Sequence, residues 1–348
     1  MTTLGRFKSR SELVPGSTSW YLADLGEFRG KQTLYTRQSP QRLKTLREHA
    51  LIESAVSSNR IEGVVVETKR VRELVFGAPL LRDRDEEEVR GYRDALNRIH
   101  DQQAALPIDE QCVRDLHRLT RGEIWDAGQY KDKDSDIIER DPDGSERVRF
   151  KTLPAAATPV AMAALIPDWE DCLKNEWVHP LIALASFNLD LLCIHPFRDG
   201  NGRVSRLLLL LQCCHLGYEV GRYISLERLI EQNKERYYET LERSSTGWHE
   251  GKHDPWPYIN YLVFILKSAY REFVERVGDV QAPRGSKTEQ VLHALRQIPA
   301  EFALSQPEQA CPGVSRDMVR RVLREQSGKL VVCRGRGRGA IWVKTPAE

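Results

Sequence analysis

The segment 194–206 reads IHPFRDGNGRVSR and gathers residue types that could carry phosphate chemistry. Gly200 and Gly202 let the backbone turn tightly and approach a ligand closely. The residues that follow begin an expected helix, whose free N–H groups and dipole attract anions. The segment therefore predicts a cradle for a phosphate group.

The charged residues of the same segment suit the remaining parts of a phosphoryl reaction. Arg203 and Arg206 lie three residues apart on one helix face, where their guanidinium groups can hold phosphate oxygens. Asp199 can hold a magnesium ion, because magnesium takes few protein carboxylates and completes its shell with water and phosphate. His195 is then free to accept a hydroxyl proton, since the ordinary imidazole pKa is about 6.5.

This segment resembles the signature of the Fic family, HxFx[D/E]GNGRxxR. Every specified position is present: His195, Phe197, Asp199, Gly200, Asn201, Gly202, Arg203 and Arg206. The resemblance implies a mainly α-helical core that binds ATP and Mg²⁺, transfers AMP to a protein hydroxyl and releases pyrophosphate.

The same resemblance implies a role for each residue of the signature. His195 would be the base that deprotonates a target Ser, Thr or Tyr, and Asp199 would bind the metal. Phe197 would anchor the loop in the core. The remaining positions would bind the phosphates, the arginines the outer ones: Gly200, Asn201, Gly202, Arg203 and Arg206.

A second pattern lies far upstream at residues 58–63, SNRIEG, which fits the [S/T]xxxE[G/N] inhibitory motif of that family. Taken alone, a serine shortly before a glutamate is also typical of a helix cap. With the signature downstream, the resemblance implies an inhibitory helix over about 41–63, with Ser58, Glu62 and Gly63 as its motif. Glu62 would pair with Arg206 and keep the γ-phosphate from its productive position.

Two further features of the family have looser counterparts. The turn-forming residues 141–144, between short β-prone pieces, predict a hairpin within 128–154. By resemblance this hairpin is the flap that aligns a target segment by β-augmentation, although relatives often have Arg where this chain has Lys131. Tyr237 and Tyr238 resemble the adenine-pocket aromatics, and we expect Tyr238 to face the base.

Composition limits the class of protein. The chain has 348 residues, 41% apolar and 29% charged, with 52 basic and 50 acidic side chains, which excludes disordered and collagen-like chains and a general polycation. Seven cysteines without CxxC spacing and nine histidines without an HExxH pair favour reduced, mostly buried thiols and a metal that arrives with substrate. No run is long enough to span a membrane and no secretory signal is visible, so we expect a cytoplasmic protein.

Hydrophobic periodicity predicts a helical protein in two or three domains. The expected helices cover residues 41–60, 68–76, 83–99, 109–121, 159–169, 180–192, 204–216, 225–243 and 256–277. The apolar run Val160–Ile166 is expected in a buried helix. We place an N-terminal helical region at 1–110, a Fic core at 111–277 and a linker at 278–286.

Residues 287–348 predict a small second domain. Helical patterns at 287–297 and 314–324, the second capped by Ser315, flank a loop-rich segment. The end, KLVVCRGRGRGAIWV, reads as two strands joined by a basic tip, and the whole resembles a winged helix-turn-helix. Basic residues that could meet DNA phosphates are Arg316, Arg320, Arg321, Arg334, Arg336 and Arg338. Docking of a protein remains an alternative of nearly equal weight.

The sequence thus predicts an autoinhibited protein adenylyltransferase (a nucleotidyltransferase) that modifies a target protein or itself. One alternative is a hydrolase that removes AMP with the same site, in which Glu62 would position water. Another is a DNA-binding regulator whose Fic core senses nucleotide. The pattern does not name the target, and it leaves monomer and homodimer open.

Overall fold

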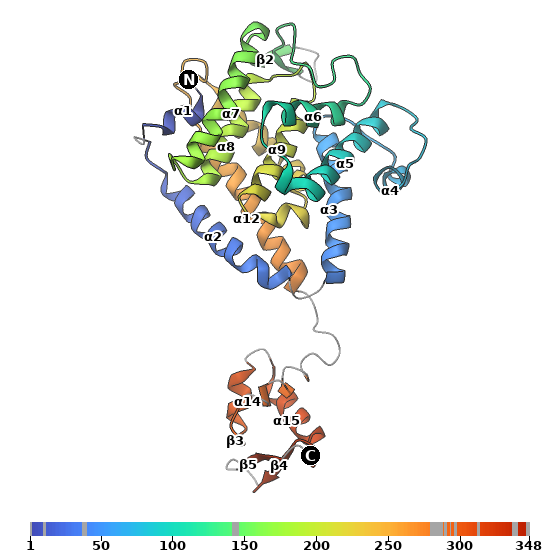
Figure 1. The fold of residues 1–348 in the computed structure, drawn as a ribbon, viewed down its shortest axis with the longest axis vertical. Helices are drawn as coiled ribbons and strands as arrows, with labels where there is room; N and C mark the ends of the chain where they lie inside the picture. The colour runs from blue at the N-terminus through green and yellow to red at the C-terminus, as the bar shows by residue number, and fades with distance from the viewer. Residues whose placement is uncertain are drawn as a thin grey trace. The chain divides into compact units, whose positions relative to one another are not determined.

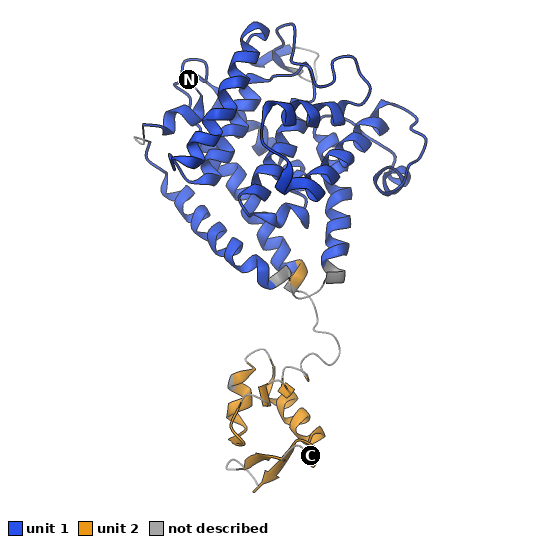
Figure 2. Cartoon of the chain, viewed as in Figure 1, with its two compact units in different colours: residues 1–275 blue, residues 276–348 orange. Residues whose placement is uncertain are grey.

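The computed structural model describes residues 2–9, 12–36, 40–140, 146–278, 288, 291–292, 294–295, 298–311, 314–335 and 340–345. The chain divides into two compact units, Met1–Glu275 and Arg276–Glu348 (Figure 2). The N-terminal region and the core expected from the sequence therefore share one unit. The expected linker, apart from Gly278, lies outside the described residues.

Helices dominate the first unit (Figure 1). Its α-helices are α1 (Thr3–Phe7), α2 (Gly16–Thr36), α3 (Pro40–Ile61), α4 (Thr68–Phe76), α5 (Arg84–Gln102), α6 (Glu110–Arg121), α7 (Thr158–Lys174), α8 (Pro180–Ile194), α9 (Asn201–His215), α10 (Leu226–Gln232), α11 (Lys234–Ser245) and α12 (Trp256–Gly278). Short 3₁₀ helices cover Gln103–Ala105, Ala155–Ala157 and Glu219–Arg222. This is the mainly helical class that the sequence predicts.

The differences from the predicted helices have local causes. The helix expected over 225–243 is two helices, because Asn233 leaves helical geometry and its side chain donates to Leu229 O instead. Helix α7 continues through Pro167 to Lys174, and Val160 on it is 75% exposed, so the expectation of a fully buried run was wrong there. Helices α1 and α2 were not predicted individually.

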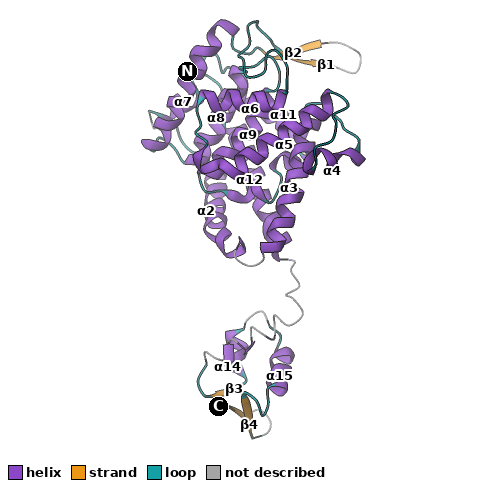
Figure 3. Cartoon of the chain, turned by 45° about the vertical axis from the view of Figure 1, so that its right-hand side comes forward, coloured by secondary structure: helices purple, strands orange, loops and turns teal. Residues whose placement is uncertain are grey.

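Helix α8 is the centre of the first unit, and its position fixes the residues that follow it. Its side chains from Leu181 to Ile194 are all buried, as expected of a helix that is apolar on every side. Helix α9 packs against it, and both lie in the middle of the helical layer in Figures 1 and 3. The Asp190 carboxylate on α8 accepts hydrogen bonds from Thr3 and Trp248, which ties α1 to this centre.

A hairpin stands out from the helices in Figure 3. Strands β1 (Ile137–Arg140) and β2 (Glu146–Phe150) pair antiparallel, with Ile138 opposite Val148 and an irregularity between Ile137 and Ile138. The predicted hairpin is confirmed in its strands, while its tip, 141–145, lies outside the described residues.

The second unit has the order helix, strand, helix, helix, strand, strand. The described residues 288, 291–292 and 294–295 are helical, and they are followed by β3 (Glu301–Ala303), α14 (Ser305–Ala310), α15 (Arg316–Glu325), β4 (Val331–Arg334) and β5 (Ile341–Lys344). The sheet order is β3-β5-β4, all antiparallel. The segment expected to be loop-rich is therefore β3 and α14, and Ser315 occupies the N-cap without a side-chain bond.

The cysteines are free thiols, all buried except the exposed Cys333. Within the ranges the structure describes, no helix is both long and apolar enough to cross a membrane.

Candidate functional site

The signature segment forms the loop between α8 and α9 and the first turn of α9. His195 caps α8 in a left-handed conformation, with φ 52° and ψ 62°, and its N–H donates to Leu191 O. Gly200 precedes α9 with φ 82°, a backbone conformation that favours glycine, and a Cβ there would lie a tight 3.1 Å from Arg121 Cδ. Two left-handed residues thus bound a short, sharply turned loop.

Phe197 and Asn201 hold this loop in place. The Asn201 side chain accepts from Phe197 N at 2.9 Å and donates to Phe197 O at 2.7 Å. The Phe197 ring is fully buried and stacks on His117 at 3.8 Å. The expected anchoring role of Phe197 agrees with this geometry, and the Asn201 amide uses one donor and one acceptor to hold the loop.

His117 is a supporting residue that the sequence analysis missed. Gly128 N donates to its Nδ1 at 2.8 Å, so Nε2 carries the proton and donates to Asp199 O at 3.0 Å. Burial lowers the pKa of His117 to about 4, which keeps the ring neutral and this tautomer fixed at pH 7. Its only signal in the sequence was a place beside Leu116 on the inward face of a helix.

The Asp199 carboxylate lies at the mouth of the site and is 57% exposed. Its Oδ2 accepts from Arg121 Nη1 at 2.6 Å, and its Oδ1 accepts from Gly200 N. Burial acts to raise the pKa of Asp199, but the charges of Arg121 and Arg203 outweigh burial and lower it. The carboxylate is therefore ionised and open to solvent on one side.

Arg203 lies deeper than the sequence suggested. It is 1% exposed, its Nη1 donates to the Glu88 carboxylate and to Asn59 Oδ1, and its Nε has no hydrogen-bond partner among the described residues. Glu88 also accepts from Arg121 at 2.8 Å. Neither Glu88 nor Arg121 was singled out from the sequence, because nothing in the local pattern of α5 or α6 shows what they face.

Arg206 contacts Ser58 and Glu62, and its pairing with Glu62 is the contact expected from the resemblance. Its Nε donates to Ser58 Oγ at 2.8 Å, and its Nη2 donates to Ser58 O at 3.0 Å and to Glu62 Oε1 at 2.6 Å. Its Nη1 is buried and has no hydrogen-bond partner in the described part of the chain. Helix α3 ends at Ile61, and Gly63, with φ 86°, completes the turn that brings Glu62 to this position.

The Glu62 carboxylate lies against the first turn of α9, beside Gly202 and Arg206. A Cβ on Gly202 would lie 2.3 Å from Glu62 Oε1, so the first turn of α9 admits this carboxylate only because residue 202 is glycine. Lys234 on α11 donates to Ile61 O at 2.9 Å and fixes the end of α3. The geometry thus joins α3, α9 and α11 around one buried guanidinium.

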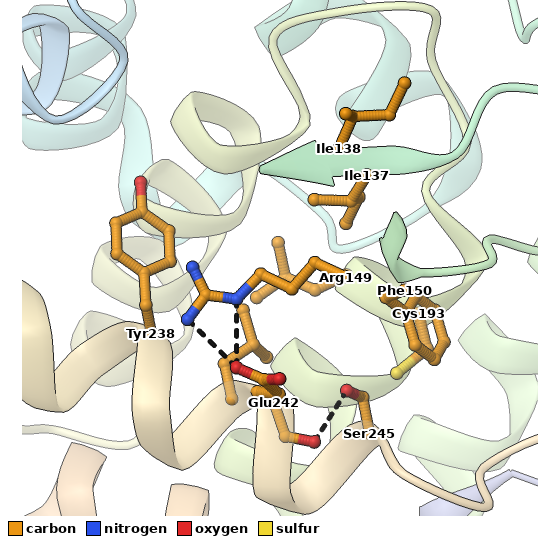
Figure 4. A pocket seen from close by; sticks show the side chains of 10 residues that line it. Ile137, Ile138, Arg149, Phe150, Cys193, Tyr238, Glu242 and Ser245 are labelled. Atoms are coloured by element: carbon orange, nitrogen blue, oxygen red, sulfur yellow. Dashed lines mark hydrogen bonds and ion pairs between the residues drawn. The ribbon is translucent and has the colours of Figure 1, made fainter. Parts of the chain in front are cut away.

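A pocket of about 280 Å³ lies between the hairpin, the end of α8 and α11 (Figure 4). Its lining residues are Ile137, Ile138, Arg149, Phe150, Leu192, Cys193, Tyr238, Leu241, Glu242 and Ser245. Arg149 pairs with Glu242 at 3.1 Å and lies 5.1 Å from the ring of Tyr238, which links the hairpin to α11. Tyr237 is buried in the core, so Tyr238 is the tyrosine that faces the pocket.

His195 and Asp199, the expected base and the expected metal ligand, differ in burial and charge. His195 is half-buried, and burial, followed by the charge of Lys131, lowers its pKa to about 4, so the ring is neutral at pH 7. Among the described residues no cluster of three His, Cys, Asp or Glu side chains could hold a metal. Asp199 is a single exposed carboxylate, which fits a magnesium ion whose other ligands are water and phosphate.

Comparison with known proteins agrees with this site. Residues 107–213 match the family model described as Fic/DOC family. The matched residues make up less than a third of the chain and include the whole of the segment 194–206. It is 25% identical over 210 residues to the protein adenylyltransferase Fic of Drosophila virilis, a match over 58% of this chain and 38% of that one. The corresponding protein of Nematostella vectensis is 26% identical over 237 residues, covering 63% and 48%. The chain thus spans less than half the length of these curated relatives.

Solved structures share the fold. A Fic family protein from Desulfovibrio desulfuricans G20 aligns with a TM-score of 0.63 at 24% identity, over 97% of this chain and 98% of that one. Fic-1 from C. elegans aligns with a TM-score of 0.58 at 18% identity, over 75% and 73%.

The buried histidines predict a dependence of stability on pH. Burial lowers the pKa of His100, His117, His195 and His253 to about 4 each, from 6.5. The unfolded chain therefore binds more protons than the folded chain between pH 6.5 and 4, and the free energy of unfolding falls as the pH falls. Asp190, whose pKa burial raises to about 6, offsets part of this loss because the folded chain takes up its proton.

Urea denaturation of wild type and His117→Phe between pH 6.5 and 4 tests how the free energy of unfolding depends on pH. The phenylalanine keeps an aromatic stack on Phe197 but cannot titrate. Loss of the two hydrogen bonds lowers stability at pH 7, while the slope against pH should decrease by up to about 1.4 kcal/mol per pH unit, the value for one proton. An unchanged slope would show that His117 titrates alike in the folded and unfolded chain.

Proposed function

We propose that this chain is a magnesium-dependent protein adenylyltransferase that transfers AMP from ATP to a Ser, Thr or Tyr hydroxyl of a target protein or of itself, and that Glu62 restrains it. The observation that carries the proposal is the buried Arg206 guanidinium at the first turn of α9. Its Nη1 has no hydrogen-bond partner in the described ranges, and the anion position before it is filled by the chain's own carboxylate. The names of the relatives support the same activity.

The chemical step follows from the place of His195 beside the phosphate cradle. The neutral imidazole accepts the proton of the target hydroxyl, and the hydroxyl oxygen attacks the α-phosphorus of ATP. A new P–O ester bond forms, the bond from the α-phosphorus to the bridging oxygen breaks, and pyrophosphate leaves. The backbone N–H groups of Asn201 and Gly202, at the N-terminus of α9, would donate to the developing charge, whereas the Gly200 N–H already donates to Asp199 Oδ1.

Asp199 is the residue that would hold the magnesium ion. The metal, when bound, neutralises phosphate charge and orients the pyrophosphate leaving group. The ion pair between Asp199 and Arg121 keeps the carboxylate ionised and oriented at the loop. Arg203 is buried against Glu88. It would therefore act on the outer phosphates through the electrostatic field of its positive charge and through the loop that it supports, not through direct contact.

The pocket beside the loop is the candidate site for the base. It adjoins the end of α8 through Leu192 and Cys193, directly before His195, and Tyr238 offers a ring on which adenine can stack. The hairpin that forms its other wall exposes Ile138 and Val148, and a target segment would align along a strand edge of this two-stranded sheet.

Restraint by Glu62 follows from competition for one cation. A γ-phosphate needs the Arg206 guanidinium that Glu62 holds at 2.6 Å, and the carboxylate also fills the space over Gly202. ATP bound with Glu62 in place would have its outer phosphates displaced, and in-line attack at the α-phosphorus needs accurate placement. The reverse activity, removal of AMP, would use the same carboxylate to position water.

We also propose that the second unit is a winged helix that docks a partner through α15. The order of its elements fits that fold, and α15 buries Val319, Val322 and Leu323 on one face. Arg316, Arg320 and Arg321 are exposed and pair with acidic neighbours at 2.9–3.7 Å, and such surface pairs are weak enough to yield to DNA phosphates. Arg336 and Arg338 lie outside the described residues.

Loss of the restraint is the first test of the proposed activity. Wild type, Glu62→Gly, Glu62→Gly/His195→Ala and Glu67→Gly are incubated with Mg²⁺ and ATP labelled at the α-phosphate, alone and in a lysate. Label should appear on protein with Glu62→Gly at least about tenfold above wild type, since the guanidinium is then free for phosphate, and should vanish in the double variant. Glu67→Gly, a nearby exposed position, should match wild type.

Absence of label with every variant, despite measured ATP binding, would overturn adenylyl transfer. AMP-modified target that loses its label with wild type but not with Glu62→Gly would instead establish the hydrolase.

The assignment of the base pocket predicts a selective effect at Tyr238. Tyr238→Ala in the Glu62→Gly background should raise the KM for ATP about 5- to 150-fold, because base stacking contributes about 1–3 kcal/mol, whereas Tyr238→Phe should change it little. An equal KM for the alanine and phenylalanine variants would place the base elsewhere.

The proposed docking of DNA predicts salt-sensitive binding by the full chain. Fluorescence anisotropy with a labelled 30-base-pair duplex should give an affinity that falls with salt, and Arg320→Ala/Arg321→Ala should reduce the slope by about 2. Lack of binding at low salt would favour a protein partner for this unit.

A further inference from the structure

Lys131 contacts the backbone on both sides of His195. It lies in the segment between α6 and β1 and is 5% exposed. Its backbone N–H donates to Pro196 O at 2.8 Å, and its Nζ donates to Ile194 O at 3.2 Å. These two carbonyl groups belong to the residues immediately before and after His195, whose own backbone is left-handed with φ 52°.

The same side chain reaches both ends of the hairpin. Lys131 Nζ donates to Thr152 Oγ1 at 2.7 Å, and Thr152 Oγ1 donates to Ser135 O at 2.6 Å. Leu153 N donates to Cys193 O at 3.3 Å. The residues that enter β1 and leave β2 are therefore joined to each other and to the end of α8.

We propose that Lys131 is a positioning residue, which holds the peptide groups flanking His195 in the left-handed turn and fastens the base of the hairpin to that turn. This inference rests on the proposed role of His195 as the base and adds the group that orients it. A left-handed conformation is strained for a residue that carries a Cβ, so contacts from outside the turn must maintain it.

The choice of a buried ammonium has an electrostatic consequence. Burial lowers the pKa of Lys131 to about 8, against the opposing charges of Asp134 and Asp136, so the side chain is still mostly charged at pH 7. That charge, after burial, is the second cause of the low pKa of His195, while Glu62 and Asp199 act in the opposite direction. Lys131 therefore keeps the base neutral as well as oriented.

Substitution of Lys131 separates this role from simple packing. The variants are Lys131→Met, which keeps the stem but removes the donor and the charge, and Lys131→Arg, which keeps both. Lys133→Met, at an exposed lysine two residues away, is the matched control. All are made in the Glu62→Gly background, and circular dichroism melting confirms that each is folded.

Lys131→Met should lower kcat at least about tenfold with little change in the KM for ATP, because misplacement of a base affects the chemical step. The acidic limb of kcat/KM should move to higher pH, since loss of the ammonium raises the pKa of His195. Lys131→Arg should restore most of both, and Lys133→Met should match its parent. If Lys131→Met does not fold, Thr152→Val removes one partner of Nζ at nearly constant volume and should shift both readouts in the same direction by a smaller amount.

An NMR titration of the His195 ring, assigned with His195→Ala, tests the inference without any activity. The His195 pKa should rise in Lys131→Met and return in Lys131→Arg, even if Glu62→Gly transfers no AMP. An unchanged His195 titration and an unchanged pH profile in Lys131→Met would overturn the inference. Equal losses in the methionine and arginine variants would also overturn it, because they would show that Lys131 only fills space.

Discussion

Burial of positive charge is the constraint on which the site depends. Arg121, Arg203 and Arg206 are each at least 94% buried around one turn of backbone, and a buried cation is tolerated only when it is paired. Glu88 pairs with the first two and Glu62 with the third. The pairing is incomplete, since buried guanidinium nitrogens on all three lack a hydrogen-bond partner among the described residues. Each of the three guanidinium groups therefore has one nitrogen donor that the described residues leave unused.

This constraint gives the proposed restraint by Glu62 its physical basis. The carboxylates of Glu88 and Glu62 do similar electrostatic work, but Glu88 is anchored within α5 and fully buried, whereas Glu62 follows the last residue of α3 and is 28% exposed. Loss of Glu88 would leave two buried guanidinium groups poorly compensated. Loss of Glu62 would leave only the Arg206 guanidinium poorly compensated, and the triphosphate of the proposed reaction could take the place of the lost carboxylate. The removable partner is the one at the end of a helix.

The part of this site that the sequence predicts is the part that is local in the chain. The loop, the two glycines and the start of α9 follow from residues 194–206, and the pair of Glu62 with Arg206 follows from two separate motifs. The remaining residues act through contacts between elements that are distant in the sequence: Glu88, His117, Arg121 and Lys131. The type of such a residue does not show which other element it will contact. In the fold, α2 contains Gly26 and Gly30 and has no continuous apolar stripe, so periodicity could not reveal it. The break at Asn233 depends on one side-chain bond, which a pattern averaged over several residues cannot show.

The ion pair between Arg121 and Asp199 adds a last consequence for the metal. A carboxylate that bonds Arg121 Nη1 at 2.6 Å and the Gly200 N–H has its orientation fixed before any nucleotide arrives, which reduces the entropy lost when a ligand binds. A metal ion bound by Asp199 would compete with Arg121 for Oδ2 of the carboxylate. Arg121, if displaced from Asp199, would still be paired with Glu88. In the proposed reaction, metal bound together with phosphate would resolve this competition, because the phosphates would supply the negative charge that the released arginine then faces. On that proposal, the arrangement would favour joint binding of metal and nucleotide over binding of the metal alone.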